Sequence, residues 1–201
     1  MPDAGSVADH LRRYYDDEVQ TRAARPLGDD RERCLARFVA ECARRGVRSV
    51  LEVGCGAGRD GAVIAGAGIA YSGIDLSPAM VAHCRSLGLD AQVALATSLP
   101  FEDGSFDAAW TMSTLMHLPG DDLAVALAEL RRVVRPGGLV EIGVWGGDED
   151  DEHEFSGGRY ARCRTDDVLR AQLDALGDVD AFEIWDVHAD GTHYQWARLT
   201  T

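Results

Sequence analysis

The stretch Val-Arg-Ser-Val-Leu-Glu-Val-Gly-Cys-Gly-Ala-Gly, residues 47–58, decides how this chain folds. Its first part, residues 47–53, is a short apolar run of β-type residues and predicts a strand. Glycines follow at positions 54, 56 and 58. A residue without a Cβ lets the backbone turn tightly and approach a ligand closely. The stretch therefore predicts a strand that ends in a tight, ligand-facing turn.

On both sides of this stretch, predicted strands alternate with predicted helices. Helices are predicted over residues 6–24, 31–45, 59–67 and 78–88, along an apolar stripe from 123 to 134, and after a Thr165 cap. Strands are predicted over residues 47–53, 69–75, 91–96, 106–112, 139–145, 179–188 and 193–200. This alternation predicts an α/β fold: a Rossmann-like, doubly wound sheet of seven strands, mostly parallel, with helices on both faces. The last two strands flank Ala189-Asp-Gly-Thr, which predicts a C-terminal antiparallel hairpin.

The length of 201 residues fits one domain. Within it we expect an N-terminal helical lid over 1–45, a cofactor-binding core over 46–145, and a substrate-side loop, helix and hairpin over 146–201. No run approaches the roughly 18 apolar residues of a membrane helix. The acidic N-terminus lacks the apolar centre of a signal peptide. We therefore expect a cytoplasmic protein, monomeric or homodimeric, with no membrane partner.

Charge and residue usage exclude several classes of function. Acidic residues outnumber basic ones by 34 to 20, for a net charge of −14. Proteins that grip nucleic-acid phosphates usually present a basic face, so we expect no nucleic-acid partner. All twenty basic residues are arginine, which excludes catalysis by lysine. The five cysteines form no C-x-x-C pair, which argues for reduced thiols and against a disulfide framework or a metal site.

Ligands of parallel sheets bind beyond the C-terminal ends of the strands, so the residues that follow strands are the informative ones. Asp75 ends the second predicted strand, where a carboxylate can accept hydrogen bonds from a ribose diol. The segment from Gly56 to Gly61 also matches G-x-G-x-x-G, the dinucleotide fingerprint. That fingerprint is misplaced here, because its first glycine should follow the strand directly and Gly54 holds that position.

Four motifs in order give a more specific reading. Glu52-Val-Gly-Cys-Gly-Ala-Gly58 resembles motif I of the class I S-adenosylmethionine-dependent methyltransferases, an acidic residue followed by G-x-G-x-G. The segments 73–80, 99–107 and 130–139 resemble that family's second motif, its run into strand four and the turn before strand five. The resemblance covers about residues 9–186. It is closest to the type-11 methyltransferase domains, which include quinone-biosynthesis C-methyltransferases.

The resemblance implies a cofactor, S-adenosylmethionine, and a set of residues around it. The three glycines of motif I, Gly54, Gly56 and Gly58, would pass beneath its methionine part, and Glu52 would organise the loop and approach the amino group. Asp75 would take the ribose hydroxyls, and Leu76 and Met80 would sandwich the adenine. The backbone around Thr111 would face the amino group, and Tyr15 would close over the cofactor.

This sequence departs from the family pattern at two places. An Asp–Ala pair commonly precedes Leu-Pro-Phe, but Leu95-Ala96 stands there. The adenine amine therefore loses a side-chain partner, and Thr97 or Ser98 is expected to supply a contact instead. A second N-terminal tyrosine is also absent, and Arg22 lies near its place.

The acceptor side of the site is less specified by the sequence. His117 follows strand four and is either a base that contacts the substrate or a structural histidine. Cys55 and Asp107 are read as structural residues rather than as catalytic ones, and Trp110 and Trp185 as packing or pocket residues. We expect a substrate pocket lined by Tyr14, Met112, His117, Trp145, Arg159 and Tyr160.

An acidic run over 148–154 follows strand five and is read as a solvated loop at the mouth of the site. Its charge would favour a neutral or cationic substrate. Arg159, Arg162 and Arg164 come directly after it and could instead hold a carboxylate. The residues leave both readings open.

The expected activity is methyl transfer from S-adenosylmethionine to an oxygen, nitrogen or carbon of a small molecule, a secondary metabolite or a quinone-like compound. The by-product would be S-adenosylhomocysteine. Three alternatives stand beside it: a cofactor-binding pseudoenzyme, a protein methyltransferase, and an NAD(P)-dependent oxidoreductase.

Overall fold

A computed structural model describes residues 3–155, 157–186 and 192–201. Its main sheet has seven strands in the order β3-β2-β1-β4-β5-β9-β8. The strands are β1 (Ser49–Val53), β2 (Ala70–Asp75), β3 (Ala91–Val93), β4 (Phe106–Met112), β5 (Val134–Gly146), β8 (Asp178–Asp186) and β9 (His193–Thr200). The first five are parallel, while β9 runs antiparallel to β5 and to β8. The predicted α/β fold with a C-terminal antiparallel pair is confirmed.

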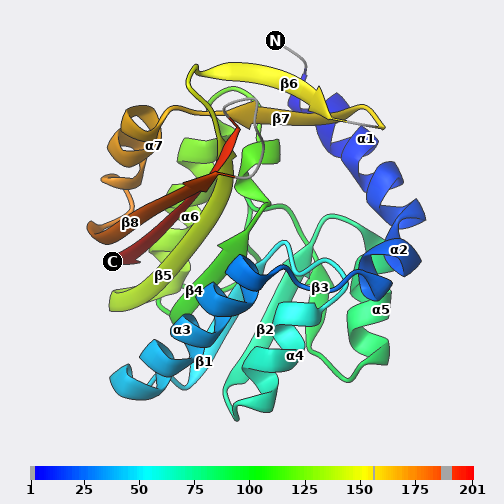
Figure 1. Ribbon diagram of the computed structural model, residues 1–201. Coiled ribbons are helices and arrows are strands. Elements are labelled where there is room, and N and C mark those ends of the chain that lie inside the picture. Colours follow the sequence, from blue (N-terminus) through cyan, green and yellow to red (C-terminus); the bar gives the residue numbers. More distant parts are fainter. Residues whose placement is uncertain (1–2, 156, 187–191) are drawn as a thin grey trace.

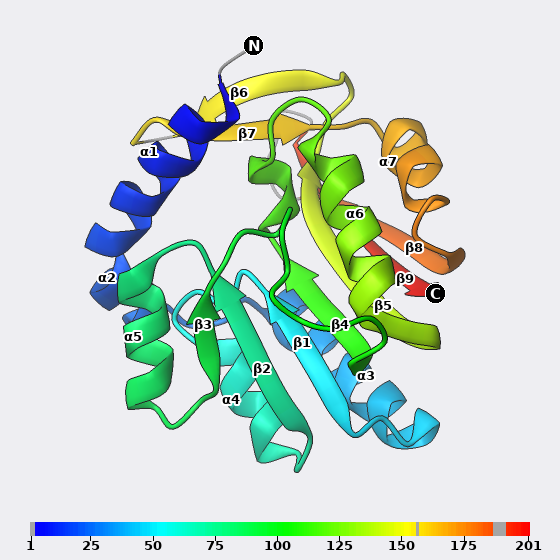
Figure 2. The same cartoon turned by 180° about the vertical axis from the view of Figure 1, so that it is seen from behind.

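Helices cover both faces of this sheet (Figures 1 and 2). On one face α3 (Asp29–Arg45), α4 (Arg59–Gly66) and α5 (Pro78–Ser86) pack around Phe38, Ile64 and Trp110. On the other face α6 (Asp122–Val133) and α7 (Asp166–Leu173) bury their leucines against β4 and β5. The two apolar layers account for the near-continuous burial of the central strands, as expected of a sheet covered on both sides.

Local signals in the sequence position the helices. The Ser77 hydroxyl accepts a hydrogen bond from the backbone N–H of Met80 at 3.1 Å, and Pro78 occupies the first turn of α5. Thr165 caps α7 in the same way. Gly46 ends α3 in the left-handed conformation, at φ 68°.

Most boundaries agree with the predictions to within two residues, and three differences matter for the site. The helix expected over 6–24 is two helices, α1 (Ala4–Asp17) and α2 (Val19–Ala24), separated at Glu18. Strand β3 ends at Val93 rather than at residue 96. Strand β5 begins at Val134, because Pro136-Gly-Gly lies within the strand across a shift in its register with β4. The predicted end of β8 at residue 188 and most of the turn that follows it lie outside the described residues.

The segment expected as a loop over 146–164 contains a second, two-stranded sheet. Strands β6 (Asp151–Phe155) and β7 (Arg159–Cys163) pair antiparallel. Tyr160, Ala161 and Cys163 of β7 are buried, which anchors the hairpin and explains why the acidic segment is ordered. Figure 1 shows this hairpin at the same end of the molecule as α1. Val7 and Leu11 of α1 pack against Tyr160 there.

Gly61 lies where α4 packs closely against the sheet. A Cβ at this position would lie 2.5 Å from the ring and hydroxyl of Tyr71 on β2. That hydroxyl is fixed by a 2.6 Å hydrogen bond to buried Glu52. We expect Gly61→Ala to lower the free energy of unfolding by about 1–3 kcal/mol, measured by urea denaturation, because the added methyl overpacks the interface.

Gly66→Ala is the matched control on the same helix. A Cβ there meets nothing within 4 Å, and the backbone is not in the left-handed region. This variant should match the wild type or gain up to about 1 kcal/mol. Equal stability of the two variants would show that Tyr71 yields to the added methyl.

Candidate functional site

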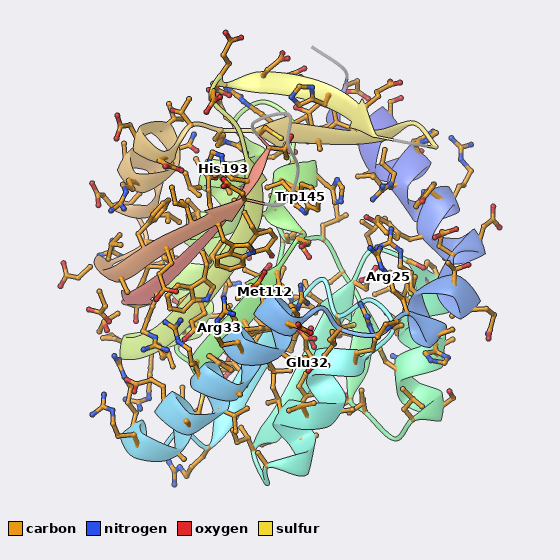
Figure 3. The ribbon with its side chains drawn as sticks, viewed as in Figure 1. Arg25, Glu32, Arg33, Met112, Trp145 and His193 are labelled. Atoms are coloured by element: carbon orange, nitrogen blue, oxygen red, sulfur yellow. The ribbon has the colours of Figure 1, made fainter. Side chains whose placement is uncertain are left out.

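A cavity of about 1160 Å³ opens at the C-terminal ends of the parallel strands. Its walls come from α1, the segment joining α2 to α3, the turn after β1, the ends of β2, β4 and β5, and β8 and β9. In Figure 3, Arg25 lies on one side of this space, with Met112 and Trp145 on the other. Residues far apart in the sequence thus meet where the topology predicts a ligand site.

The glycine turn after β1 forms the floor of the cavity. Backbone N–H groups of Gly54 and Cys55 both donate to the carbonyl of Ile74, at 2.8 and 2.9 Å. All three motif glycines have positive φ, of 79°, 50° and 74°. A Cβ at Gly54 would overlap Thr114, and one at Gly58 would crowd Leu89 and Cys84. The glycines are therefore required by the backbone conformation, and at 54 and 58 also by packing within the chain.

Asp75 at the end of β2 is tied to this turn. Its carboxylate accepts hydrogen bonds from the backbone N–H of Gly56 at 2.8 Å and of Ser77 at 2.9 Å. Burial raises the pKa of Asp75, and these backbone donors oppose that effect. A carboxylate has about four lone-pair sites, so two hydrogen bonds leave capacity for a ligand. Asp75 lines the cavity.

Glu52 also lines the cavity, but one of its oxygens is already engaged. The Tyr71 hydroxyl donates to it at 2.6 Å. Burial, followed by the nearby charge of Asp60, raises the pKa of Glu52 well above its usual range. Its expected approach to an amino group stays a prediction.

Most of the residues expected around the adenine lie together on the cavity wall. Leu76, Met80 and Thr97 all line the cavity. Ser98 does not line the cavity; its N–H donates to the Leu95 carbonyl at 3.0 Å and closes the turn that carries Thr97.

At the end of β4 the cavity wall lies one to three residues later than expected. Thr111 is fully buried within the strand, whereas Met112, Ser113 and Thr114 face the cavity. Ser113 has a φ of 57°, an uncommon conformation for a residue with a side chain. Its N–H donates to the Gly143 carbonyl at 2.7 Å, and its hydroxyl lies 3.0 Å from that of Tyr194. Nothing in the sequence distinguished Ser113 from its neighbours.

His117 is held from two sides over the cavity. Its Nδ1 lies 2.6 Å from the Tyr160 carbonyl, and its Nε2 lies 2.9 Å from the Tyr15 hydroxyl. A carbonyl only accepts, so Nδ1 carries the proton, and in the neutral ring Nε2 accepts from Tyr15. Burial lowers the pKa of His117 to about 4. The ring is therefore neutral near pH 7 and is a weak base.

The other predicted pocket residues divide into two groups. Met112, His117, Trp145 and Arg159 line the cavity. Tyr14 and Tyr160 do not. The Arg159 guanidinium lies over the Tyr14 ring, 5.1 Å from its centroid, and Tyr160 contributes the carbonyl that holds His117.

Several lining residues were missed by sequence reasoning. Three are arginines around the α2–α3 connection and the start of α4: Arg25, Arg31 and Arg59. Arg31 pairs with buried Asp60, which also accepts from the Trp110 indole at 2.7 Å. At the opposite wall Tyr194 was also missed. Its ring stacks with that of Trp185, which the sequence already offered as a packing or pocket residue, with centroids 5.0 Å apart. Only the topology brings these residues together, because they come from segments that the motifs do not include.

The acidic run over 148–154 lies outside the lining of the cavity. Asp150 pairs with Arg162 at 2.8 Å, so part of the acidic and basic charge here is mutually compensated. Across residues 3–155, 157–186 and 192–201, no group of three His, Cys, Asp or Glu side chains could hold a metal ion. In the same ranges no helix has the length and apolar character needed to cross a membrane.

Comparison with known proteins identifies the central part of the chain. Residues 51–142 match a family described as a methyltransferase domain. The chain carries a methyltransferase domain. This domain holds the glycine turn, Asp75, and the β4 end with His117.

Relatives and solved structures agree with this assignment. The domain is 38% identical over 108 residues to 2-methyl-6-phytyl-1,4-hydroquinone methyltransferase of Synechocystis, covering 51% of this chain and 33% of the relative. The chain spans about a third of the length of the first curated relatives that it matches.

The fold has solved counterparts with more than one named activity. One is the 1,6-didemethyltoxoflavin-N1-methyltransferase of Burkholderia thailandensis, with a TM-score of 0.77, 21% identity, and coverage of 100% of this chain and 91% of that chain. Another is the [4+2]-cyclase SpnF, with a TM-score of 0.74, 20% identity, and coverage of 95% and 94%. At these identities the likeness shows the fold, and function must be argued from the site.

The burial of His117 predicts a dependence of stability on pH. Unfolded histidine takes up a proton below a pH of about 6.5, whereas folded His117 resists protonation until about pH 4. The unfolded state therefore binds more protons in this window, and stability falls as the pH is lowered through it, by up to about 3 kcal/mol.

The measurement is urea unfolding between pH 7 and pH 4.5. We expect His117→Gln to lose less stability than the wild type as the pH is lowered, whatever its stability at pH 7. His83→Gln, at a half-buried position on α5, is the control and should keep the slope of the wild type. A slope in His117→Gln equal to that of the wild type would contradict the role of this ring.

Proposed function

We propose that this chain is an S-adenosylmethionine-dependent methyltransferase that methylates an oxygen, nitrogen or carbon of a small-molecule acceptor. The observation that carries the proposal is the glycine turn bonded to Asp75 at the floor of a large cavity, within a matched methyltransferase domain. Cys34, Cys42, Cys55 and Cys84 are free thiols, which supports action in a reducing compartment, the cytoplasm.

The residues present fit the cofactor. Asp75 keeps lone pairs for two ribose hydroxyls after its two backbone hydrogen bonds. Leu76 and Met80 offer apolar contacts to a flat base, and Thr97 lies on the same wall. A Cβ at Gly56 would meet no protein atom within 4 Å, so the turn is open there. The chemistry supplied by the bound cofactor is an electrophilic methyl group with a neutral thioether as leaving group.

Arginines near the start of α4 fit the carboxylate of the methionine part. Burial lowers the pKa of Arg59; Asp60 opposes that effect, while the positive charges of Arg31, Arg25 and Arg22 add to it. Its guanidinium donates a hydrogen bond to the Arg25 carbonyl, which is a neutral acceptor. An anion bound here would relieve the repulsion among these cations.

The protein's contribution to methyl transfer is then mainly alignment of the acceptor atom with the methyl group and sulfur. Ser113 and Thr114 place backbone and hydroxyl groups at the end of β4, beside the wall formed by Trp145 and Tyr194. Because the pKa of His117 is about 4, we propose that its role is to hold the Tyr15 hydroxyl over the cavity rather than to act as the base.

Calorimetry tests the cofactor. S-adenosylmethionine should bind the wild type, whereas NAD(H) should not. Asp75→Ala should weaken binding at least tenfold, because hydrogen bonds to a charged group contribute about 1.5–3 kcal/mol. Asp90→Ala is the control, since Asp90 bonds Ser72 and lies outside the cavity lining. Unchanged affinity in Asp75→Ala would contradict the ribose site, and binding of NAD(H) alone would overturn the proposed function.

Turnover tests the Tyr15–His117 pair, once isotope-labelled cofactor and a metabolite extract have identified the acceptor by the mass of its labelled product. Tyr15→Phe and His117→Ala should each lower kcat about tenfold, and the double variant should be no worse than either, because both break one unit. Tyr14→Phe is the control, since Tyr14 does not line the cavity.

Two results would contradict this positioning role. A loss of a hundredfold or more in His117→Ala alone would make the histidine a base. A loss within a few-fold in both single variants would show that neither residue matters for turnover. A protein that binds the cofactor but labels no product from extract or added protein would be a pseudoenzyme.

A further inference from the structure

Two buried thiols lie in contact at the edge of the glycine turn. The Sγ atoms of Cys55, in the turn, and Cys84, on α5, are 3.7 Å apart. Cys55 is 4% exposed and Cys84 is fully buried. The proposed mechanism uses neither thiol.

The surroundings hold these two sulfur atoms together. The Cys55 N–H is bonded to the Ile74 carbonyl at 2.9 Å, and the Cys55 side chain packs against Gly73, where an added Cβ would lie 3.2 Å from its sulfur. The Cys84 thiol is 3.2 Å from the Gly56 carbonyl, to which it donates. Cys55 therefore has little room to turn away from Cys84.

A small reagent can reach this pair from one side. Cys55 lines the cavity, whereas Cys84 lies behind it. Cys34 is another thiol on the cavity wall, but burial raises the pKa of Cys34 to about 11, and within the described part of the chain its thiol makes no hydrogen bond to a second cysteine. The chain thus offers one paired and one unpaired thiol facing the same space.

We propose that Cys55 and Cys84 form a peroxide-oxidisable pair whose disulfide weakens cofactor binding, an inference that rests on the proposed function for its second half. The Cys55 sulfur attacks a peroxide oxygen, the O–O bond breaks, and a sulfenic acid and water result. The Cys84 sulfur then attacks the Cys55 sulfur, the S–S bond forms, the S–O bond breaks, and the departing hydroxide takes up the Cys84 proton as water. Two thiols lose two electrons and one hydrogen peroxide gains them.

The acid–base properties of the two thiols affect the rate at which the pair is oxidised. Contact with Cys84 and burial raise the pKa of Cys55. Because the thiolate is the reactive form, we expect the attack of Cys55 on peroxide to be slow and to require sustained exposure to the oxidant. In the reduced pair, contact with the Cys55 thiol lowers the pKa of Cys84.

Closing the disulfide changes the cofactor floor in two ways. A disulfide bond is about 2.05 Å long, so the two sulfur atoms, now 3.7 Å apart, must approach each other and pull the turn toward α5. The S–H donor to the Gly56 carbonyl is also lost. Because the N–H of the same residue bonds Asp75, the displacement reaches the carboxylate proposed to hold the ribose.

The test compares reduced, peroxide-treated and dithiothreitol-restored protein. Intact mass and peptide mapping should show the loss of two hydrogen atoms and a Cys55–Cys84 link. Calorimetry with S-adenosylhomocysteine should show affinity at least tenfold weaker after peroxide and restored by dithiothreitol, which does not reverse methionine oxidation. Bound S-adenosylhomocysteine should slow the formation of the link, because the route to Cys55 is the cavity.

Matched variants separate the pair from general oxidation. Cys84→Ser keeps a hydroxyl for the Gly56 carbonyl and should show no link and no peroxide-dependent change in affinity. Cys34→Ser removes the unpaired cavity thiol and should respond like the wild type. Cys55→Ala is examined by mass alone, and peroxide should form no disulfide in this variant.

Each outcome decides one part of the proposal. Peroxide that oxidises other thiols without linking Cys55 to Cys84 overturns the pair, and a link that leaves affinity unchanged overturns its consequence. If reduced protein binds no S-adenosylhomocysteine, the proposed function fails together with that consequence, while the link is still decided by mass.

Discussion

The rest of the site depends on the hydrogen bond between the Gly56 N–H and the Asp75 carboxylate. It joins the turn after β1 to the end of β2, two neighbouring parallel strands. The same carboxylate accepts from Ser77, whose hydroxyl caps α5. One acidic residue therefore fixes the turn, the strand end and the start of a helix. Its remaining lone pairs face the cavity in a geometry that the protein itself has set.

Much of this framework could be predicted from the sequence, because the residues that build it act locally. Glycines at alternate positions, an acid at a strand end and a Ser-Pro helix start each have a conformational consequence within a few residues. The β6–β7 hairpin was not predicted, since its acidic and basic residues gave no clear alternation, and contacts from distant segments hold it in place, such as the burial of Tyr160 and Cys163.

The acceptor side was only partly predictable, for a different reason. The Arg31–Asp60 pair and the Trp185–Tyr194 stack join residues 29 and 9 positions apart, through sheet topology rather than through a local motif. The family resemblance placed the backbone around Thr111 at the cofactor, whereas Met112, Ser113 and Thr114 line the cavity. The left-handed turn at Ser113 moves the first cavity-facing groups past Thr111. A positive φ at a serine carries no sequence signature of its own.

The residues that line the cavity come from two parts of the chain, one inside the matched methyltransferase domain and one outside it. The turn, Asp75 and the β4 end lie within residues 51–142, the part shared with the family. Tyr15, Arg31, Trp145, Arg159 and Tyr194 lie outside it, on the N-terminal helices, the end of β5, the hairpin and the last strands. Changes in these outer segments can reshape the space for an acceptor while leaving the floor intact. The shape of the outer cavity and the geometry of its floor are therefore set by separate segments of the chain.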